Sequence, residues 1–221
     1  MKEYWWFSEK DHKIGYGDGR EAAIGVTHAV DGPIKLCEKG LYASPKALDA
    51  LQYASGPCAW LVGLGGEVID GDDKSCATER TYIAGGVDTT EVLRAFARRV
   101  ALDVAHLWSM SDVVRSYLET GDKSISAAAS DAAWNAASDA ASAATNYAAS
   151  AAAWAAAWTA ASDAAWTAAR DAASDAASYA ARAAAWNAAR DAAWTAVRDA
   201  AREKYAGWLD EMLRAAIKME G

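Results

Sequence analysis

The stretch that decides the predicted fold begins Ala128-Ala129-Ser130-Asp131-Ala132-Ala133-Trp134-Asn135. The same four-residue unit, two alanines followed by a variable pair, continues to Arg202, and only Thr145 and Val197 replace an alanine. Alanine has the highest helix propensity of all residues, and neither Gly nor Pro occurs in this stretch. The repeat therefore predicts helix throughout. At 1.5 Å per residue, an unbroken helix of this length would be a rod of about 120 Å.

The period of four conflicts with the geometry of a straight α-helix. A helix of 3.6 residues per turn rotates a mark repeated every four residues by about 40° per unit, so no apolar stripe stays on one face. Three arrangements remain open: rods that wrap around one another with right-handed twist, a chain that folds back into a hairpin near Thr145-Asn146-Tyr147, and a helix underwound towards π geometry.

Six tryptophans all occupy the third place of the repeat unit: Trp134, Trp154, Trp158, Trp166, Trp186 and Trp194. A lone rod would expose all of them to water, which favours self-association. We therefore predict a homo-oligomer that forms through these side chains.

Residues 1–86 have the pattern of a small mixed α/β domain. All three Pro lie in this part of the chain, and short β-type runs at 3–7, 23–28, 59–64, 67–69 and 80–84 predict strands. Ser44-Pro45 predicts the start of a helix over 46–53, with Ser as the N-cap. Gly63-Leu64-Gly65-Gly66 is expected to be a hairpin turn, and Asp70-Gly71-Asp72-Asp73-Lys74 a solvated turn.

A helical segment is predicted between this domain and the repeat. One apolar stripe in a predicted helix over 92–108 joins Leu93, Phe96, Val100, Val104 and Leu107, and a second helix is predicted over 112–118. The predicted organisation is a head over 1–86, a helical collar over 87–122 and a tail over 123–221. The predicted fold is α+β, with a small mixed head, a short collar and a long Ala-rich helical rod or hairpin.

Charge and composition exclude several classes of function. The net charge is −8, which disfavours a nucleic-acid-binding protein. The three cysteines show no CxxC spacing and the three histidines no HxxxH spacing, so we expect no metal site and no cofactor. The chain has no apolar run long enough for a membrane span or a signal peptide, which predicts a protein of the cytoplasm.

Two parts of the chain resemble tailed-phage and prophage proteins. The first includes Leu36-Cys37-Glu38-Lys39-Gly40-Leu41-Tyr42-Ala43-Ser44 and Gly71-Asp72-Asp73-Lys74-Ser75-Cys76-Ala77-Thr78-Glu79-Arg80, which are similar to a small uncharacterised phage domain. The second, Arg98 to Trp108 followed by Tyr117 to Asp122, is similar to the collar that precedes Ala/Trp-rich tails in such proteins. The resemblance implies a phage origin and expression inside a bacterial host, and this family carries no assigned reaction.

The head also resembles ADP-ribosyltransferases, which use a His on an early strand, a Tyr on a strand before a helix, and a late Glu. The matching residues are His28, Tyr42 and Glu79, and the resemblance implies that they are catalytic and that NAD is a substrate. The chain departs from the family because His28 lacks the Gly-Thr or Gly-Ser that normally follows it.

The predicted function is that of a non-enzymatic phage accessory protein. It would self-associate through its tail and bind a host or phage protein or other component through its head, with interference in a host defence system as one role. The alternative is an ADP-ribosyltransferase-like enzyme that modifies a host target with NAD.

Overall fold

The computed structural model describes residues 2–15, 18–107, 110–142, 177 and 193–220. The chain forms two compact units: Met1–Thr89 together with Leu209–Gly221, and Thr90–Trp208. The last helix, α7 (Ala193–Glu220), contributes its first part to the second unit and its last part to the first. The boundary after Thr89 lies close to the predicted end of the head, whereas the end of the predicted tail belongs to the first unit.

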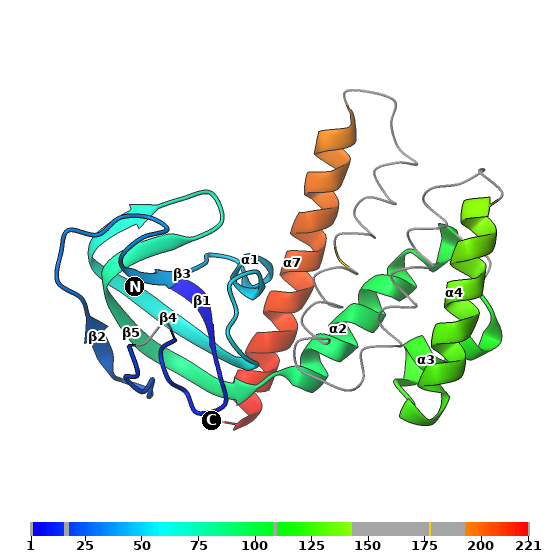
Figure 1. Cartoon of the computed structure of the whole chain (residues 1–221), viewed down its shortest axis with the longest axis horizontal. Helices are drawn as coiled ribbons and strands as arrows, with labels where there is room; N and C mark the ends of the chain where they lie inside the picture. Colours follow the sequence, from blue (N-terminus) through cyan, green and yellow to red (C-terminus); the bar gives the residue numbers. More distant parts are fainter. Residues whose placement is uncertain (1, 16–17, 108–109, 143–176, 178–192, 221) are drawn as a thin grey trace. The chain divides into compact units, whose positions relative to one another are not determined.

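The first unit is built on a five-stranded antiparallel sheet (Figure 1). Its strands are β1 (Glu3–Ser8), β2 (Thr27–Ala29), β3 (Leu41–Ala43), β4 (Cys58–Asp70) and β5 (Ser75–Asp88). The order is β1-β4-β5-β2, and β3 also pairs with β5, nearer the start of that strand than β2. The short helix α1 (Ala47–Leu51) follows β3 where a helix is predicted, but it is shorter than the predicted range 46–53. Its N-cap is Lys46 and not the predicted Ser44, whose N–H and carbonyl pair with Trp5 of β1.

Alternation along β1 divides its aromatic side chains between the two faces of the sheet. Trp5 and Phe7, each 1% exposed, lie on one face. Trp6 lies on the other face, where its ring centroid is 6.3 Å from that of Trp60 and 5.5 Å from that of Tyr82. Because successive side chains of a strand point to opposite faces, the run Tyr4-Trp5-Trp6-Phe7 supplies two apolar layers at once.

The predicted hairpin turn at residues 63–66 is wrong. These residues lie inside β4, where the pairing with β5 shifts register between Gly65 and Val68. Gly66 has a φ of 68°, and a Cβ there would collide with the Thr78 hydroxyl, so glycine serves a bulge here. The turn is at Gly71, whose N–H donates to the Lys74 carbonyl at 2.9 Å.

The last part of α7 completes the first unit. Leu209, Leu213 and Ile217, four residues apart, are buried. The Trp5 indole N–H donates to Asp210 at 2.5 Å, and Arg214 donates to Glu3 at 2.7 Å. The first strand and the last helix of the chain are therefore joined by side chains.

The second unit is helical. It contains α2 (Thr90–Asp103), α3 (Asp112–Thr120), α4 (Ser126–Ser142) and the first part of α7, with single turns at Ala105–Leu107 and Lys123–Ile125. A core cluster in this unit consists of six buried residues: Ala101, Val114, Tyr117, Leu118, Ala129 and Ala133. Both predicted collar helices are present, although the first ends at Asp103, where Lys204 and Tyr205 donate to the carboxylate.

The predicted fold with a long helical rod is wrong. The structure is a mixed α/β fold, and its described helices are much shorter than the predicted rod. The repeat begins in α4, which ends at Ser142, and its other end lies in a separate helix, α7, the longest described at 28 residues. Paired alanines favour helix but do not specify its length. Ala129 and Ala133 pack in a core because the drift of a four-residue repeat is small over a single pair of units. Residues 143–176 and 178–192 lie outside the described part of the chain, as does the bend predicted near Thr145.

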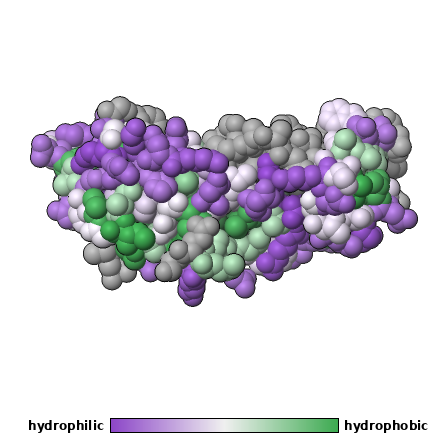
Figure 2. Space-filling model, turned by 90° about the horizontal axis from the view of Figure 1, so that it is seen from below, coloured by the Kyte–Doolittle hydropathy of each residue, from purple (hydrophilic) through white to green (hydrophobic). Residues whose placement is uncertain are grey.

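The face shown in Figure 2 carries both hydrophilic areas and apolar patches in the described part of the chain. The exposed apolar side chains of the first unit include Ile24, which is 64% exposed. No helix among the described residues is both long and apolar enough to cross a membrane.

Candidate ligand-binding pocket

The first unit contains a pocket of about 530 Å³. Such a volume lies within the range of about 300–1,000 Å³ that is usual for small-molecule sites. Its walls come from β1, from β3, from the loops before β3 and from single residues further along the chain: Trp5, Trp6, Phe7, Ile14, Asp18, Cys37, Glu38, Lys39, Tyr42, Tyr53, Lys74 and Arg80. Aromatic rings and charged groups thus share one concave surface.

Arg80 is the most deeply buried charged residue of this pocket, with 2% of its surface exposed. It lies on β5 directly opposite His28 of β2 and on the same face as Tyr82. Its Nε and Nη2 groups donate to the Tyr82 hydroxyl at 3.3 and 2.8 Å, and Nη1 donates to the Tyr42 carbonyl at 2.8 Å. The guanidinium stacks 4.0 Å from the Trp6 ring centroid.

These contacts position Arg80 without neutralising it. Among the described residues, no carboxylate forms an ion pair with it. Burial lowers the pKa of Arg80, partly offset by Tyr82, but a guanidinium stays protonated in proteins. A guanidinium carries five N–H groups, so the three hydrogen bonds leave donors for a ligand.

Two lysines add positive charge to the same pocket. The Lys74 ammonium lies 3.9 Å from the Tyr53 ring centroid and 5.9 Å from that of Tyr42, and Lys39 lies on the wall. In the described part of the chain, neither lysine forms an ion pair. Burial lowers the pKa of Lys74, but the Cys37 thiol and Tyr53 outweigh it, so the net shift is upward and the ammonium stays charged.

The two acidic residues of the wall are compensated from outside the pocket. The Asp18 carboxylate forms an ion pair with Nε of Arg20 at 2.6 Å, and the Glu38 carboxylate forms one with the ammonium of Lys35 at 2.6 Å. Neither Arg20 nor Lys35 lines the pocket. The pocket is therefore electropositive in a chain whose net charge is −8.

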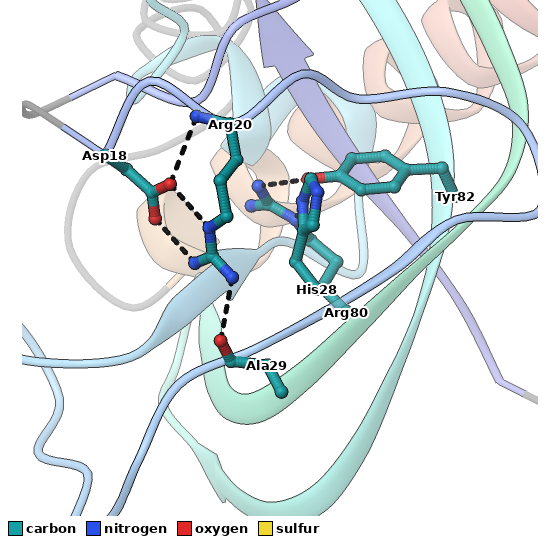
Figure 3. Close-up of polar contacts among 6 residues, drawn as sticks. All are labelled: Asp18, Arg20, His28, Ala29, Arg80 and Tyr82. Carbon is teal, nitrogen blue, oxygen red and sulfur yellow. Dashed lines mark hydrogen bonds and ion pairs between the residues drawn. The ribbon is translucent and has the colours of Figure 1, made fainter.

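Behind Arg80, a short hydrogen-bonded chain runs to His28 (Figure 3). The Tyr82 oxygen accepts from Arg80, so its one hydrogen is directed to Nδ1 of His28, 3.0 Å away. Burial, with the charges of Arg20 and Arg80, lowers the pKa of His28, which keeps the imidazole neutral and Nδ1 an acceptor at neutral pH. Burial raises the pKa of Tyr82, so the phenol keeps its proton.

The structure does not bring the three predicted catalytic residues together. Tyr42 lines the pocket, and its hydroxyl donates to the Lys35 carbonyl at 3.2 Å. His28 contacts Tyr82 and is not part of the wall. Glu79 is exposed and, as the neighbour of Arg80 on β5, points to the other face of the sheet. Their catalytic role stays a prediction, and the geometry gives them no shared position for a substrate.

The tryptophans predicted to drive self-association are mostly outside the described residues. Trp134 lies on α4 and is 53% exposed. Trp194 lies in α7, where its side chain is not described, and Trp154, Trp158, Trp166 and Trp186 lie outside the described part. Self-association stays a prediction.

Sequence reasoning missed Arg80, Lys74, Lys39 and Trp6. The signal for Arg80 was its parity with Tyr82 in a β-type run, which places both on one face of a strand. Lys74 follows an acidic turn and resembles a solvated residue in sequence. Within the described ranges, no three His, Cys, Asp or Glu residues form a group that could hold a metal ion.

Comparison with known proteins gave no relative: no family model matches the chain, and neither a curated protein nor a solved structure matches it.

Proposed function

We propose that the first unit is a non-enzymatic binding module for a small organic anion. The anionic group would bind Arg80, and the apolar part of the ligand would lie against the aromatic walls around Trp6 and Tyr42. The observation that carries the proposal is the state of Arg80: 2% exposed, on a pocket wall, and without an ion pair among the described residues.

Burial of the Arg80 charge has an energetic cost. An ion transferred from water into the protein loses several kcal/mol of hydration, and a partner of opposite charge restores part of it. Among the described residues, the partners of Arg80 are neutral: a hydroxyl, a carbonyl and two aromatic faces. A carboxylate or phosphate in the pocket would complete this set, because both accept paired N–H donors of a guanidinium.

The resemblance of the sequence to phage proteins supports a setting for this function. We propose that the protein acts in the cytoplasm of an infected bacterium and holds a host or phage component there, which would interfere with a host process that depends on that component.

The test is calorimetric titration of the full-length protein with phenyl phosphate, and with phenol as the uncharged counterpart. We expect phenyl phosphate to bind with one site per chain and phenol not to bind measurably. The variant Arg80→Gln should weaken phenyl phosphate binding by about tenfold or more, because charge-assisted hydrogen bonds contribute about 1.5–3 kcal/mol.

The matched control is Arg115→Gln, which removes an exposed arginine from α3 in the second unit. It should leave the affinity unchanged. Arg80→Lys retains the positive charge without the planar guanidinium. The melting temperatures of both Arg80 variants show whether a loss of binding reflects unfolding. Equal affinity of a folded Arg80→Gln variant, or no binding by the wild type, would overturn the proposal.

A further inference from the structure

Two cations of the pocket lining, Arg80 and Lys74, lie against different aromatic rings. Their separation indicates which class of anion fits the pocket. We infer that the ligand carries two linked phosphate groups, one bound at Arg80 and the other at Lys74. This inference rests on the proposed function, because it concerns the same pocket.

The first step is that both cations are held by aromatic faces. Arg80 lies 4.0 Å from the Trp6 centroid and 5.2 Å from that of Tyr82. Lys74 lies 3.9 Å from the Tyr53 centroid. A cation–π contact fixes the place of a charge but brings no negative charge of its own that could replace an anionic ligand.

Arg80 and Lys74 both lie next to Tyr42. The Tyr42 carbonyl accepts from Arg80 at 2.8 Å, while its ring centroid lies 5.9 Å from the Lys74 ammonium. Tyr42 therefore separates two cationic positions on one wall. A single small anion that accepts both free N–H groups of Arg80 would leave Lys74 without an anionic partner among the described residues.

The third step is the match of charge. Arg80, Lys74 and Lys39 give the wall three positive charges without ion pairs among the described residues, whereas Asp18 and Glu38 have their own cations. A phosphate monoester brings a charge of about −1.5 to −2 at pH 7. Two phosphate groups therefore match three cations better than one phosphate or two carboxylates.

The experiment compares three probes on the full-length protein: inorganic pyrophosphate, inorganic phosphate and succinate. We expect pyrophosphate to bind at least about tenfold more tightly than phosphate, and succinate to bind more weakly than pyrophosphate. Lys74→Gln should lower the affinity for pyrophosphate at least about fivefold while changing that for phenyl phosphate less than about twofold. Lys218→Gln, which removes an exposed lysine at the end of α7, is the matched control and should change neither.

The outcomes separate this inference from the proposed function. If phenyl phosphate binds through Arg80 but pyrophosphate binds no more tightly than phosphate, the inference fails and the proposed function stands. If succinate binds as tightly as pyrophosphate, a ligand with two phosphate groups is excluded. The same holds if Lys74→Gln weakens the binding of pyrophosphate and of phenyl phosphate equally. If no anion binds the wild type, both proposals fail.

Discussion

Arg20 and Arg80 lie in the same unit, near the same histidine, but in opposite electrostatic surroundings (Figure 3). Arg20 forms a two-point ion pair with Asp18, with Nε and Nη2 each 2.6 Å from a carboxylate oxygen, and donates to the Ala29 carbonyl. Arg80 is more deeply buried, and the groups that it contacts in the described part of the chain are neutral.

The difference shows that burial alone does not identify a binding residue. Arg20 has its counter-ion from its own loop, so its charge is used to fix the position of that loop. Arg80 has its position fixed by β5, Trp6 and Tyr82, and no carboxylate among the described residues forms an ion pair with it.

The largest effect is expected when Arg80 is given the same kind of partner as Arg20. Trp6→Glu places a carboxylate where the indole covers the guanidinium, and an internal ion pair should abolish phenyl phosphate binding. Trp6→Gln removes the same ring without adding charge and should retain part of the affinity. Calorimetry on both variants checks this, and equal affinities would show that charge is not what makes the pocket selective.

The reverse change removes the partner of Arg20. Asp18→Asn should lower the free energy of unfolding by about 1 kcal/mol, a value at the low end for charged hydrogen bonds because the pair is partly exposed. Since Asp18 lines the pocket, the variant should also bind phenyl phosphate several-fold more tightly. Urea unfolding and calorimetry measure the two effects. Asp72→Asn, at an exposed position, should produce neither, and a weaker affinity in Asp18→Asn would contradict the electrostatic account.

The pKa of His28 is affected by burial and by the charges of both arginines. Burial, Arg20 and Arg80 hold the pKa of His28 below its ordinary value, whereas Asp18 opposes them. The unfolded chain therefore takes up the proton first, so this group contributes stability above about pH 6.5 that is lost as the pH falls through the folded-state pKa.

The urea midpoint of the wild type should accordingly fall between pH 7.5 and pH 5.5 more than that of His28→Gln, whose amide oxygen can still accept from Tyr82. An identical fall in both proteins would show that His28 does not carry this dependence.

The smallest effect is expected at Lys35, which neutralises Glu38 as Arg20 neutralises Asp18. Both groups of this pair are largely exposed, so Lys35→Gln should change the free energy of unfolding by less than about 0.5 kcal/mol. It should weaken phenyl phosphate binding slightly, because the Glu38 charge on the pocket wall is no longer offset. A stronger affinity would contradict this account.

Local patterns in the sequence predicted most of the first unit. The aromatic run at Trp5 led to the correct strand because alternation is a local effect. Ser44-Pro45 led to a helix at the correct place but with the wrong N-cap, because the backbone of Ser44 pairs with Trp5 of a strand distant in sequence. The turn at residues 63–66 was misplaced because glycine serves bulges as well as turns, and only the pairing with β5 distinguishes them. The rod was wrong because helix propensity does not determine where a helix ends.

The pocket was much harder to predict. A charged residue in a strand is ordinarily solvent-exposed, so nothing in the sequence around Arg80 indicated that Trp6, from a distant strand, would cover it. Lys74 is brought to Tyr53 by the β4–β5 hairpin; the sequence predicted a turn at residues 70–74 but not the aromatic ring that Lys74 contacts. The match of His28, Tyr42 and Glu79 to a family pattern depended on chain order, whereas strand alternation places Glu79 on the other face.

The contacts of Trp5 with Asp210 and of Glu3 with Arg214 make the sheet unit discontinuous in sequence. Everything from Thr90 to Trp208 is, in topological terms, an insertion into it. A protease cut within that insertion would leave the C-terminal part of α7 attached to the sheet only by non-covalent contacts, Leu209, Leu213 and Ile217 among the residues involved. The integrity of the pocket would then depend on the concentration of a separate peptide, so cleavage far away in the sequence would alter the sheet unit without touching a residue that lines its pocket.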